Sequence, residues 1–515
     1  MKMMNHIKKT ALVAAVLIGN SSVDASSSTT RSLQKTYETI QGRSCFRSLD
    51  GMIESMTDLA AKYPDLITME SIGKSYIKKY SPSPGDYGRN MDYDLPPGYD
   101  IYAFNVTAAN SARKSSDKGK MLITSGVHAR EWAPPELNAR FIETLVEGYN
   151  TNADITWILE HNEIHAILYV NPDGRAISEK YPSSYWRKNL NPEGCGNGVD
   201  LNRNLDFKWG DTNGASKDPC ANDYHGSSPN SEPETQAVVD YAKKLFPEGQ
   251  RKDDPEKEMN KPFGEDITGV YIDIHASGGF VYYPWGHVDS KSPDNEALEA
   301  LGRKINYFNS YRLWAGGQSD FMYEASGDFS DYMYGALGVA SFGYEIGDDF
   351  QQDCATFEDE VVPINLPSLI YAAKIAMKPY KEVKGPDVLK INTRVLSGRV
   401  RVVVNASDSK MVNSIKGFPA HSSGNQIITA VHLYLDVHPD DYQEGTTDKR
   451  WDMEVLDDNW DTTEETVRYD VPTRGISSGR HTVYVQAIDS RGYKGPVSST
   501  FIDIPAQNSF LRGGP

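Results

Sequence analysis

Two histidines and a glutamate directly follow strand-like runs of the sequence. His128 and Glu131 come just after the apolar run 121–124, and His275 follows the run 270–274. A spacing of three residues lets His128 and Glu131 face one ion. In open α/β sheets the binding crevice lies at the carboxyl ends of the strands, so we expect His275 at the same edge. Two histidines and a glutamate, with water in a fourth position, are the ligand set of a hydrolytic zinc site. The sequence therefore predicts one Zn²⁺ per chain.

A His-x-x-Glu pair is common, so the zinc prediction depends on the motifs around it. No His-Glu-x-x-His helix occurs in the chain, which removes the commonest alternative pattern of zinc peptidases. Further motifs stand in chain order at residues 185–188, 200–204, 224–234, 323–327 and 342–345. With the zinc residues they extend over roughly residues 45–380, and together they resemble a zinc metallocarboxypeptidase of the pancreatic carboxypeptidase A/B type.

The resemblance implies both a fold and an activity. The implied fold is α/β, a mixed, mostly parallel eight-stranded sheet between helices. The implied activity is removal of the C-terminal residue from peptides and proteins by a zinc-activated water, with substrates that carry a free C-terminal carboxylate. Glu345 matches the general base, since a carboxylate can take the water proton and pass it to the leaving amine. Arg187 matches the cation that stabilises the oxyanion.

The resemblance also assigns residues to substrate binding. Asn202 and Arg203 match the clamp on the substrate's terminal carboxylate, which the planar guanidinium fork of arginine suits. Tyr323 matches the tyrosine that closes over bound substrate, and Arg130 is expected to assist from the zinc loop. Asp200 is expected to accept the second imidazole N–H of a zinc-bound histidine, His128, and so to set its tautomer.

The specificity pocket departs from the family pattern. Alignment on Tyr323 places Ser330 where related enzymes carry an apolar residue for aromatic and aliphatic ends, or an aspartate for Lys and Arg ends. Gly286 keeps the pocket open, and Asp328 supplies a carboxylate if its side chain turns inward; otherwise it faces solvent or caps a turn. We expect broad specificity, with apolar and aromatic ends favoured and basic ends tolerated. Two residues after His275 the pancreatic enzymes carry a tyrosine, whereas this chain has Ala276 and Ser277 after His275. The sequence therefore does not predict which residues contact the substrate upstream of the scissile bond.

Four cysteines allow three disulfide pairings, and their spacing does not choose among them. The resemblance pairs Cys195 with Cys220, which leaves Cys45 with Cys354. Residues 1–25 have the layout of a signal peptide, in which basic residues precede the apolar run 11–18 and small residues follow. We therefore expect a secreted, extracellular protein.

The N-terminal region also bears on membrane attachment and activation. The apolar run 11–18 is shorter than the roughly 20 residues that a membrane-spanning helix needs, and no later stretch supplies a span. Residues 26–44 are expected to form a Ser/Thr-rich tail. This tail is too short for the usual activation segment of the pancreatic enzymes, so we expect no zymogen control of that kind.

The composition excludes some classes of partner. Against 53 basic residues the chain has 71 acidic ones, and its net charge of −18 opposes binding to nucleic acid. A hydrophobic content of 39% with 10% aromatic residues is typical of a soluble globular chain. We expect a monomer.

Strand-like and helix-like segments alternate through the first three quarters of the chain, which favours an α/β catalytic domain at residues 45–382. The predicted strands are 101–106, 121–124, 164–170 and 270–274, and the predicted helices are 48–63, 136–149, 232–246 and one around 367–377. Residues 388–505 instead alternate apolar and polar positions, most clearly at 399–406, 428–437 and 481–489. They predict an all-β, immunoglobulin-like sandwich as an accessory domain. Its acidic stretch 440–465 lacks regular calcium-ligand spacing and favours a solvated face.

Two other functions are compatible with parts of the same sequence pattern. A non-catalytic peptide-binding protein on the same fold would be marked by loss of a zinc ligand or of Glu345, and all of these are present. A peptidase for cell-wall or unusual peptides would use the β domain as a surface-binding module. Asn202 and Arg203 instead favour substrates with ordinary C-terminal carboxylates.

Overall fold

The structure is a computed structural model that describes residues 35–506 apart from 91–92, 248–258, 317–322, 412–424 and 446–448. The predicted signal peptide, residues 1–25, lies outside the described residues. Part of the predicted tail 26–44 forms a strand, because β1 (Thr39–Ile40) pairs with β2 (Arg43–Arg47). Regular structure therefore begins before Cys45.

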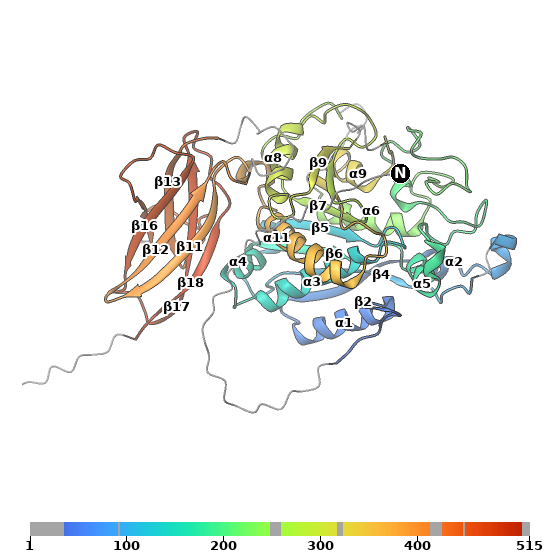
Figure 1. Cartoon of the computed structure of the whole chain (residues 1–515), viewed down its shortest axis with the longest axis horizontal. Helices are drawn as coiled ribbons and strands as arrows, with labels where there is room; N and C mark the ends of the chain where they lie inside the picture. Colours follow the sequence, from blue (N-terminus) through green and yellow to red (C-terminus); the bar gives the residue numbers. More distant parts are fainter. Residues whose placement is uncertain are drawn as a thin grey trace, which may run out of the picture. The chain divides into compact units, whose positions relative to one another are not determined.

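An eight-stranded mixed sheet forms the centre of the N-terminal three quarters of the chain (Figure 1). Its strands are β3 (Ile67–Lys74), β4 (Asp100–Val106), β5 (Gly119–Ser125), β6 (Asn162–Ile167), β7 (Val270–His275), β8 (Phe280–Tyr283), β9 (Arg312–Ala315) and β10 (Ala340–Glu345). Their order is β3-β4-β6-β5-β7-β10-β8-β9. The central strands β6, β5, β7 and β10 run parallel to one another, and so do β8 and β9, whereas the pairs β3–β4, β4–β6 and β10–β8 are antiparallel. The predicted fold class is confirmed.

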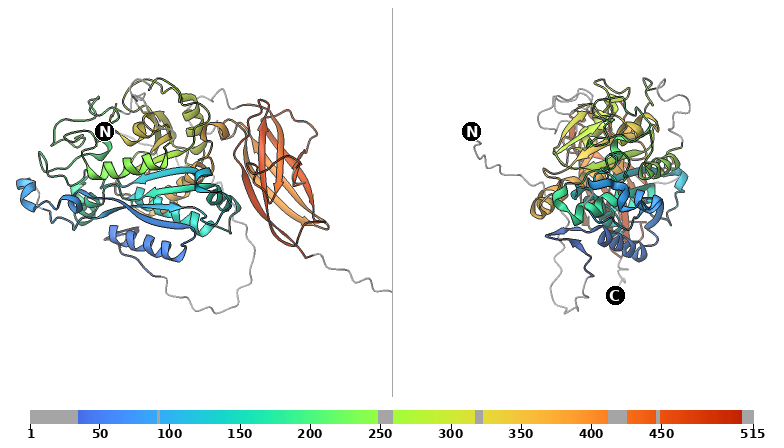
Figure 2. Two further views of the ribbon diagram at one scale, coloured as in Figure 1. Left: turned by 180° about the vertical axis from the view of Figure 1, so that it is seen from behind. Right: turned by 90° about the vertical axis from the view of Figure 1, so that its right-hand side faces the viewer.

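Helices cover both faces of this sheet. They are α1 (Leu49–Lys62), α2 (Tyr76–Tyr80), α3 (Ala133–Gly148), α4 (Ala153–His161), α5 (Pro172–Lys180), α6 (Pro233–Leu245), α8 (Asn295–Ile305), α9 (Phe329–Gly335), α10 (Cys354–Thr356), α11 (Val362–Lys374) and α12 (Pro379–Glu382). Figure 1 shows α3 and α11 on one face of the sheet, and the view from behind in Figure 2 brings α6 to the front. Every residue of β6 and β7 is buried, as expected for parallel strands covered on both faces.

The predicted helix at residues 48–63 illustrates how local sequence sets an element. The Ser48 hydroxyl accepts a 3.1 Å hydrogen bond from the Gly51 N–H and caps α1, whose apolar side chains Met52 and Met56 are buried. Side chains four residues apart lie on one face of a helix, so this pair anchors α1 to the core.

The C-terminal part contains two four-stranded antiparallel sheets that share one apolar core. One has the order β11-β12-β16-β15, and the other β14-β13-β17-β18. Their bounds are β11 (Asp387–Leu396), β12 (Arg399–Ser407), β13 (Ile428–Leu435), β14 (Arg450–Asp452), β15 (Glu454–Val455), β16 (Glu464–Pro472), β17 (Gly479–Asp489) and β18 (Ser498–Ile504). In β12 the alternate residues Val400, Val402 and Val404 are buried, as the sequence alternation predicts. The domain bounds and the immunoglobulin-like character stay predictions.

Both implied disulfides are present. Cys45 pairs with Cys354 at a Cα–Cα distance of 5.5 Å, and Cys195 pairs with Cys220 at 5.3 Å. Cys45–Cys354 joins β2 to the start of α10, and Cys195–Cys220 closes a loop across the clamp region. Among the described residues no helix has the length and apolarity that spanning a membrane requires.

Candidate active site

Three neighbouring strands end at the site. β5 ends at Ser125, just before the segment that carries His128 and Glu131, and His275 is the last residue of β7. β5 and β7 are parallel, with Ser125 opposite Ile274, so these residues emerge at the same edge of the sheet. β10 pairs with the other side of β7 and places Glu345 opposite His275. The topology therefore brings the predicted ligands and the predicted base together.

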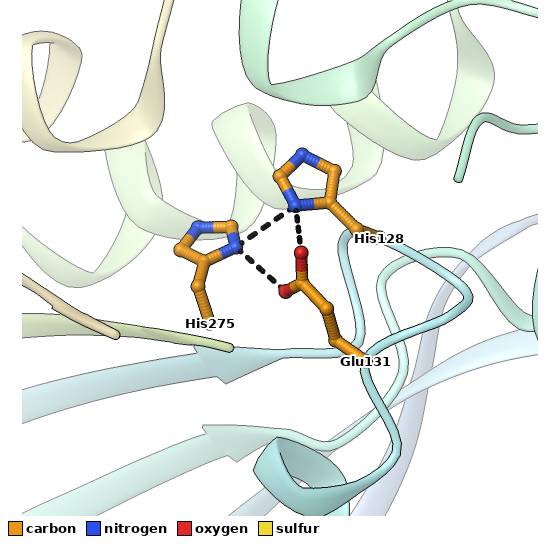
Figure 3. A group of neighbouring side chains, drawn as sticks. All are labelled: His128, Glu131 and His275. Carbon is orange, nitrogen blue, oxygen red and sulfur yellow. Dashed lines mark hydrogen bonds and ion pairs between the residues drawn. The ribbon is translucent and has the colours of Figure 1, made fainter. Parts of the chain in front are cut away.

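The three predicted ligands point toward one another (Figure 3). His128 Nδ1 lies 2.8 Å from Glu131 Oε1, and His275 Nδ1 lies 3.2 Å from Glu131 Oε2. The two Nδ1 atoms are 3.1 Å apart, and all three side chains are almost fully buried. Buried imidazoles and a carboxylate this close together form a metal-binding donor set.

The outer nitrogens of both rings face further carboxylates. His128 Nε2 lies 3.2 Å from Asp200 Oδ1, and His275 Nε2 lies 2.8 Å from Asp273 Oδ2. Each imidazole thus lies between two carboxylates, and a neutral ring carries only one proton. With that proton directed outward, the inner lone pairs of both rings are available for a cation. The arrangement fits Zn²⁺, whose histidine ligands typically donate their other N–H to a carboxylate.

Asp200 was expected from the sequence, whereas Asp273 was not. Asp273 precedes His275 by two residues in β7, and such residues lie on the same face of a strand. That spacing was the available signal. Asp273 also accepts a 2.7 Å hydrogen bond from the Thr124 hydroxyl, which fixes its carboxylate.

Arg187 is held beside the zinc ligands by Asp200. Its Nε and Nη2 donate to Asp200 Oδ2 at 3.1 and 2.8 Å, and Nη1 lies 4.0 Å from Glu131 Oε1. Burial alone would raise the pKa of Asp200, but Arg187 and His128 outweigh it and hold that pKa well below its usual value. Asp200 therefore stays ionised and orients one histidine and one arginine at once.

Glu345 has the environment of a proton acceptor. Burial raises its pKa to about 8, Glu131 adds to the rise, and the nearby His275 opposes it. A carboxylate whose pKa lies near the working pH is suited to take up and release a proton.

The predicted clamp residues lie beside the metal ligands. Asn202 Nδ2 is 3.3 Å from His275 Nε2, and its Oδ1 accepts a 3.0 Å hydrogen bond from the Phe329 N–H. Arg203 donates to the carbonyls of Gly214 and Asn202, both at 2.6 Å. Main-chain acceptors thus fix the direction of the buried guanidinium.

Two predicted substrate-binding residues are less enclosed. Arg203 Nη2 donates to the Tyr323 hydroxyl at 3.0 Å, yet 63% of Tyr323 is exposed. Arg130 stacks on the Phe350 ring, with its guanidinium carbon 4.1 Å from the centroid. Tyr323 therefore combines a contact to the clamp with freedom to rearrange.

Comparison with known proteins agrees with this geometry. Residues 96–365, just over half of the 515-residue chain, match the family described as zinc carboxypeptidase. The chain belongs to the zinc carboxypeptidase family. Its matched residues include the three predicted ligands, Glu345 and the predicted clamp residues, and they end before β11.

Individual relatives of this zinc carboxypeptidase are distant. The chain is 29% identical over 339 residues to carboxypeptidase B2 of Bos taurus, covering 64% of this chain and 69% of the relative. It is 26% identical over 326 residues to carboxypeptidase A1 of Bos taurus, covering 62% and 66%. The crystal structure of thrombin activatable fibrinolysis inhibitor superposes with a TM-score of 0.52 at 25% identity, covering 65% of this chain and 75% of that one.

The residues predicted to line the specificity pocket cluster around α9. The carboxylate of Asp328 caps this helix, because its Oδ1 accepts a 3.0 Å hydrogen bond from the Asp331 N–H. Its Oδ2 is buried, has no hydrogen-bond partner among the described residues, and lies 3.5 Å from the point where Gly286 would carry a Cβ. The Ser330 hydroxyl is likewise buried without a partner in this part of the structure. Asp328 thus both caps a turn and directs one oxygen toward Gly286.

The pKa of the Asp328 carboxyl is raised from its ordinary value. Burial raises its pKa to about 7, and the neighbouring Asp331 adds to that rise. Asp331 itself pairs with His287 Nδ1 at 2.6 Å and accepts the Gly286 N–H at 2.9 Å. Asp331 is therefore occupied by its own partners, while Asp328 keeps an oxygen available.

Proposed function

We propose that the chain is a secreted, zinc-dependent carboxypeptidase that hydrolyses the C-terminal residue of peptides and proteins. The observation that carries the proposal is the pair of imidazoles, each between two carboxylates, with their inner nitrogens 3.1 Å apart and Glu345 on the next strand. His128, Glu131 and His275 hold one zinc ion per chain in this proposal.

The chemistry divides between the metal and the protein. When bound, zinc supplies Lewis acidity, which lowers the pKa of a bound water and polarises a substrate carbonyl. Glu345 accepts the proton of the attacking water and returns it to the leaving amine. Arg187, which Asp200 fixes in position, places its positive charge where the carbonyl oxygen becomes negative.

The preference for a chain terminus comes from Arg203. Its guanidinium is buried and directed by main-chain carbonyls, so it binds a carboxylate without first having to be ordered. Asn202 adds an amide beside it, and Tyr323 exchanges its hydrogen bond with Arg203 for one to the substrate. Because only the last residue of a peptide carries this carboxylate, the site acts as an exopeptidase.

The side chain of the leaving residue is received near Ser330, Gly286 and Asp328. The uncharged serine and the absent side chain of glycine admit large apolar and aromatic groups. The Asp328 oxygen without a partner supports tolerance of basic ends. We therefore propose broad specificity, with basic residues accepted less readily than apolar ones.

A library of peptides that differ only in the C-terminal residue tests the proposal directly. We expect release of apolar and aromatic residues, weaker release of Lys and Arg, and loss of all release after zinc chelation. C-terminally amidated peptides are the matched control, and they should stay intact because they lack the carboxylate. Release that persists with a chelator, or equal cleavage of amidated peptides, would refute the function. N-terminal sequencing of the exported protein tests secretion, with Ser26 as the expected first residue.

A further inference from the structure

A second group of metal-ligating side chains lies away from the peptidase site. It consists of His161, the last residue of α4, and of His438 and Asp441, which follow β13. One ligand atom from each residue lies within 4.8 Å of those of the other two. The proposed catalytic mechanism uses none of these residues.

The hydrogen bonds of His161 leave the lone pair of its Nε2 atom available for a cation. Its Nδ1 lies 3.0 Å from the Trp157 carbonyl oxygen, which can only accept, so this nitrogen carries the proton. Its Nε2 lies 3.1 Å from Asp441 Oδ2. In the neutral ring the Nε2 lone pair therefore faces a carboxylate oxygen, an arrangement that a positive charge between the two would stabilise. A metal ion or a second ring proton can supply that charge.

The same pattern distinguishes the proposed catalytic zinc site. There His128 and His275, like His161, have an oxygen atom beside each ring nitrogen, and their rings are 4.7 Å apart and tilted by 36°. The rings of His161 and His438 are 4.0 Å apart and tilted by 37°. The two clusters resemble each other in ligand types and in the relation of their rings.

His438 supplies a third donor. It is 5% exposed, and its Nε2 is buried without a hydrogen-bond partner in the part of the chain that the structure describes. The ring packs against Trp157, with centroids 4.9 Å apart. Its Nδ1 lies 3.2 Å from the Asp440 N–H. Metal binding through Nε2 moves the ring proton to Nδ1, so the Asp440 N–H has to turn away from this nitrogen and one long hydrogen bond is lost.

Asp441 completes the set. Arg113 Nη2 pairs with Oδ1 at 2.5 Å and fixes the carboxylate, while Oδ2 faces His161. The Asp441 side chain is 51% exposed, which gives water access for a fourth ligand. Two imidazoles and one carboxylate suit zinc, whereas calcium and magnesium prefer all-oxygen sites. The C-terminal end of a helix, where His161 lies, also favours a cation.

We propose that His161, His438 and Asp441 bind a second zinc ion, which joins α4 to the segment after β13. This site is structural rather than catalytic. It adds a metal cross-link between the α/β part of the chain and its C-terminal sheets.

Zinc content per chain, measured by elemental analysis of the full-length protein equilibrated with micromolar free zinc, tests the proposal. We expect two zinc ions in the unaltered chain, one in His275→Gln and one in His438→Gln. His481→Gln is the matched control, because His481 also lies between a carboxylate, Asp436, and a carbonyl, Ser477, but belongs to no three-ligand cluster among the residues that the structure describes. It should keep two zinc ions.

A second measurement covers the case in which His438→Gln does not fold. In the background of His275→Gln, added zinc should raise the melting temperature, and adding Asp441→Asn should abolish most of that shift. Zinc content in His438→Gln equal to that of the unaltered chain would overturn the proposal. The proposal would be overturned equally if zinc did not change the melting temperature of His275→Gln. A second proton on His161 would then explain why its Nε2 lies beside the Asp441 carboxylate.

Discussion

At the scale of single residues, the proposed zinc site depends on carboxylates outside its ligand set. Asp200 and Asp273 each face the outer nitrogen of one ligand histidine. By accepting that N–H they select the tautomer whose inner lone pair can bind zinc. The two aspartates come from different elements, but their roles toward His128 and His275 are equivalent.

Asp273→Asn should weaken zinc binding 10- to 100-fold, which is the usual effect of losing such a partner. An amide is a poorer acceptor and no longer favours the required tautomer of His275. Competition titration with a zinc-binding dye measures the change in Kd. Asp470→Asn, which alters an aspartate of the C-terminal sheets paired with Arg401, is the control and should leave the Kd unchanged. An unchanged Kd in Asp273→Asn would contradict the role of this aspartate.

Ser330→Asp should raise kcat/KM for peptides that end in arginine by at least about tenfold, because an enclosed charge pair discriminates between substrates where a hydroxyl does not. Asp328→Asn, made in the chain that keeps Ser330, should lower kcat/KM for the same Arg-ended peptides. Steady-state rates on matched Arg-ended and Phe-ended peptides measure both effects. A strong preference for arginine in the unaltered enzyme, lost in Asp328→Asn, would show that Asp328 dominates the pocket.

Residue types and spacing were sufficient to predict that His128, Glu131 and His275 lie together, because each follows an apolar run that ends at the same edge of the sheet. The orientation of Asp328 was not predictable, since capping a helix and facing the pocket involve different oxygens of one carboxylate. The side chain of Asp273 could have been placed beside His275, because residues two apart in a strand lie on the same face. It was instead interpreted only as part of a buried strand.

At the scale of elements, long periodic segments were predictable and very short ones were not. The strand 270–274 and the helix 48–63 appear as β7 and α1 with shifts of about one residue. The two-residue strand β1 depends on pairing with β2 and has no periodicity of its own. Its existence is set by tertiary contact, which local patterns do not contain.

Buried carboxylates connect three of the helices. Asp173 of α5 accepts hydrogen bonds from the Ser75 hydroxyl and the Ile77 N–H, both at 2.8 Å, at the start of α2. Glu234 of α6 accepts the Tyr76 N–H at 2.6 Å. Burial raises the pKa of Glu234 to about 8, with Glu232 and Asp173 adding to the rise. This group therefore couples stability to pH.

Glu234→Gln should reduce the loss of stability between pH 5 and pH 8. Glu234 has a higher pKa in the folded protein than its ordinary value of 4.5, so the folded state binds more protons between these values. The free energy of unfolding then falls as pH rises from about 4.5 to about 8. Denaturant unfolding at both pH values should give a difference smaller by at least ~1 kcal/mol in the variant. Glu147→Gln, at an exposed position of α3, should behave like the unaltered protein; equal pH dependence in all three would refute the coupling.

At the scale of the whole molecule, a buried ion pair joins the α/β part to the C-terminal sheets. Lys304 of α8 lies 2.7 Å from Asp387 of β11, and both side chains are at most 4% exposed. Asp387 also accepts a 2.7 Å hydrogen bond from the Tyr371 hydroxyl. These contacts were not predictable, because an ion pair between segments far apart in the sequence leaves no local pattern in either segment.

Asp387→Ala should lower the free energy of unfolding by roughly 3 kcal/mol, because it leaves the charge of Lys304 buried without its partner. Hydrolysis of small peptides should be unaffected, since none of the site residues lies beyond β10. Denaturant unfolding and peptide hydrolysis are measured on the same preparations. Lys449→Ala, which breaks the exposed pair of Lys449 with Asp436, is the control, with an expected effect below about 1 kcal/mol. A comparable small effect in Asp387→Ala would contradict a stabilising role for the buried pair.

In the proposed mechanism Glu345 moves the proton while His128, Glu131 and His275 hold the metal. Glu345→Gln tests it most directly when kcat, KM and zinc content are measured on one preparation. We expect a kcat several orders of magnitude lower, a KM changed little, and the same zinc content as in the unaltered enzyme. Turnover within tenfold of the unaltered enzyme, with zinc in place, would contradict it.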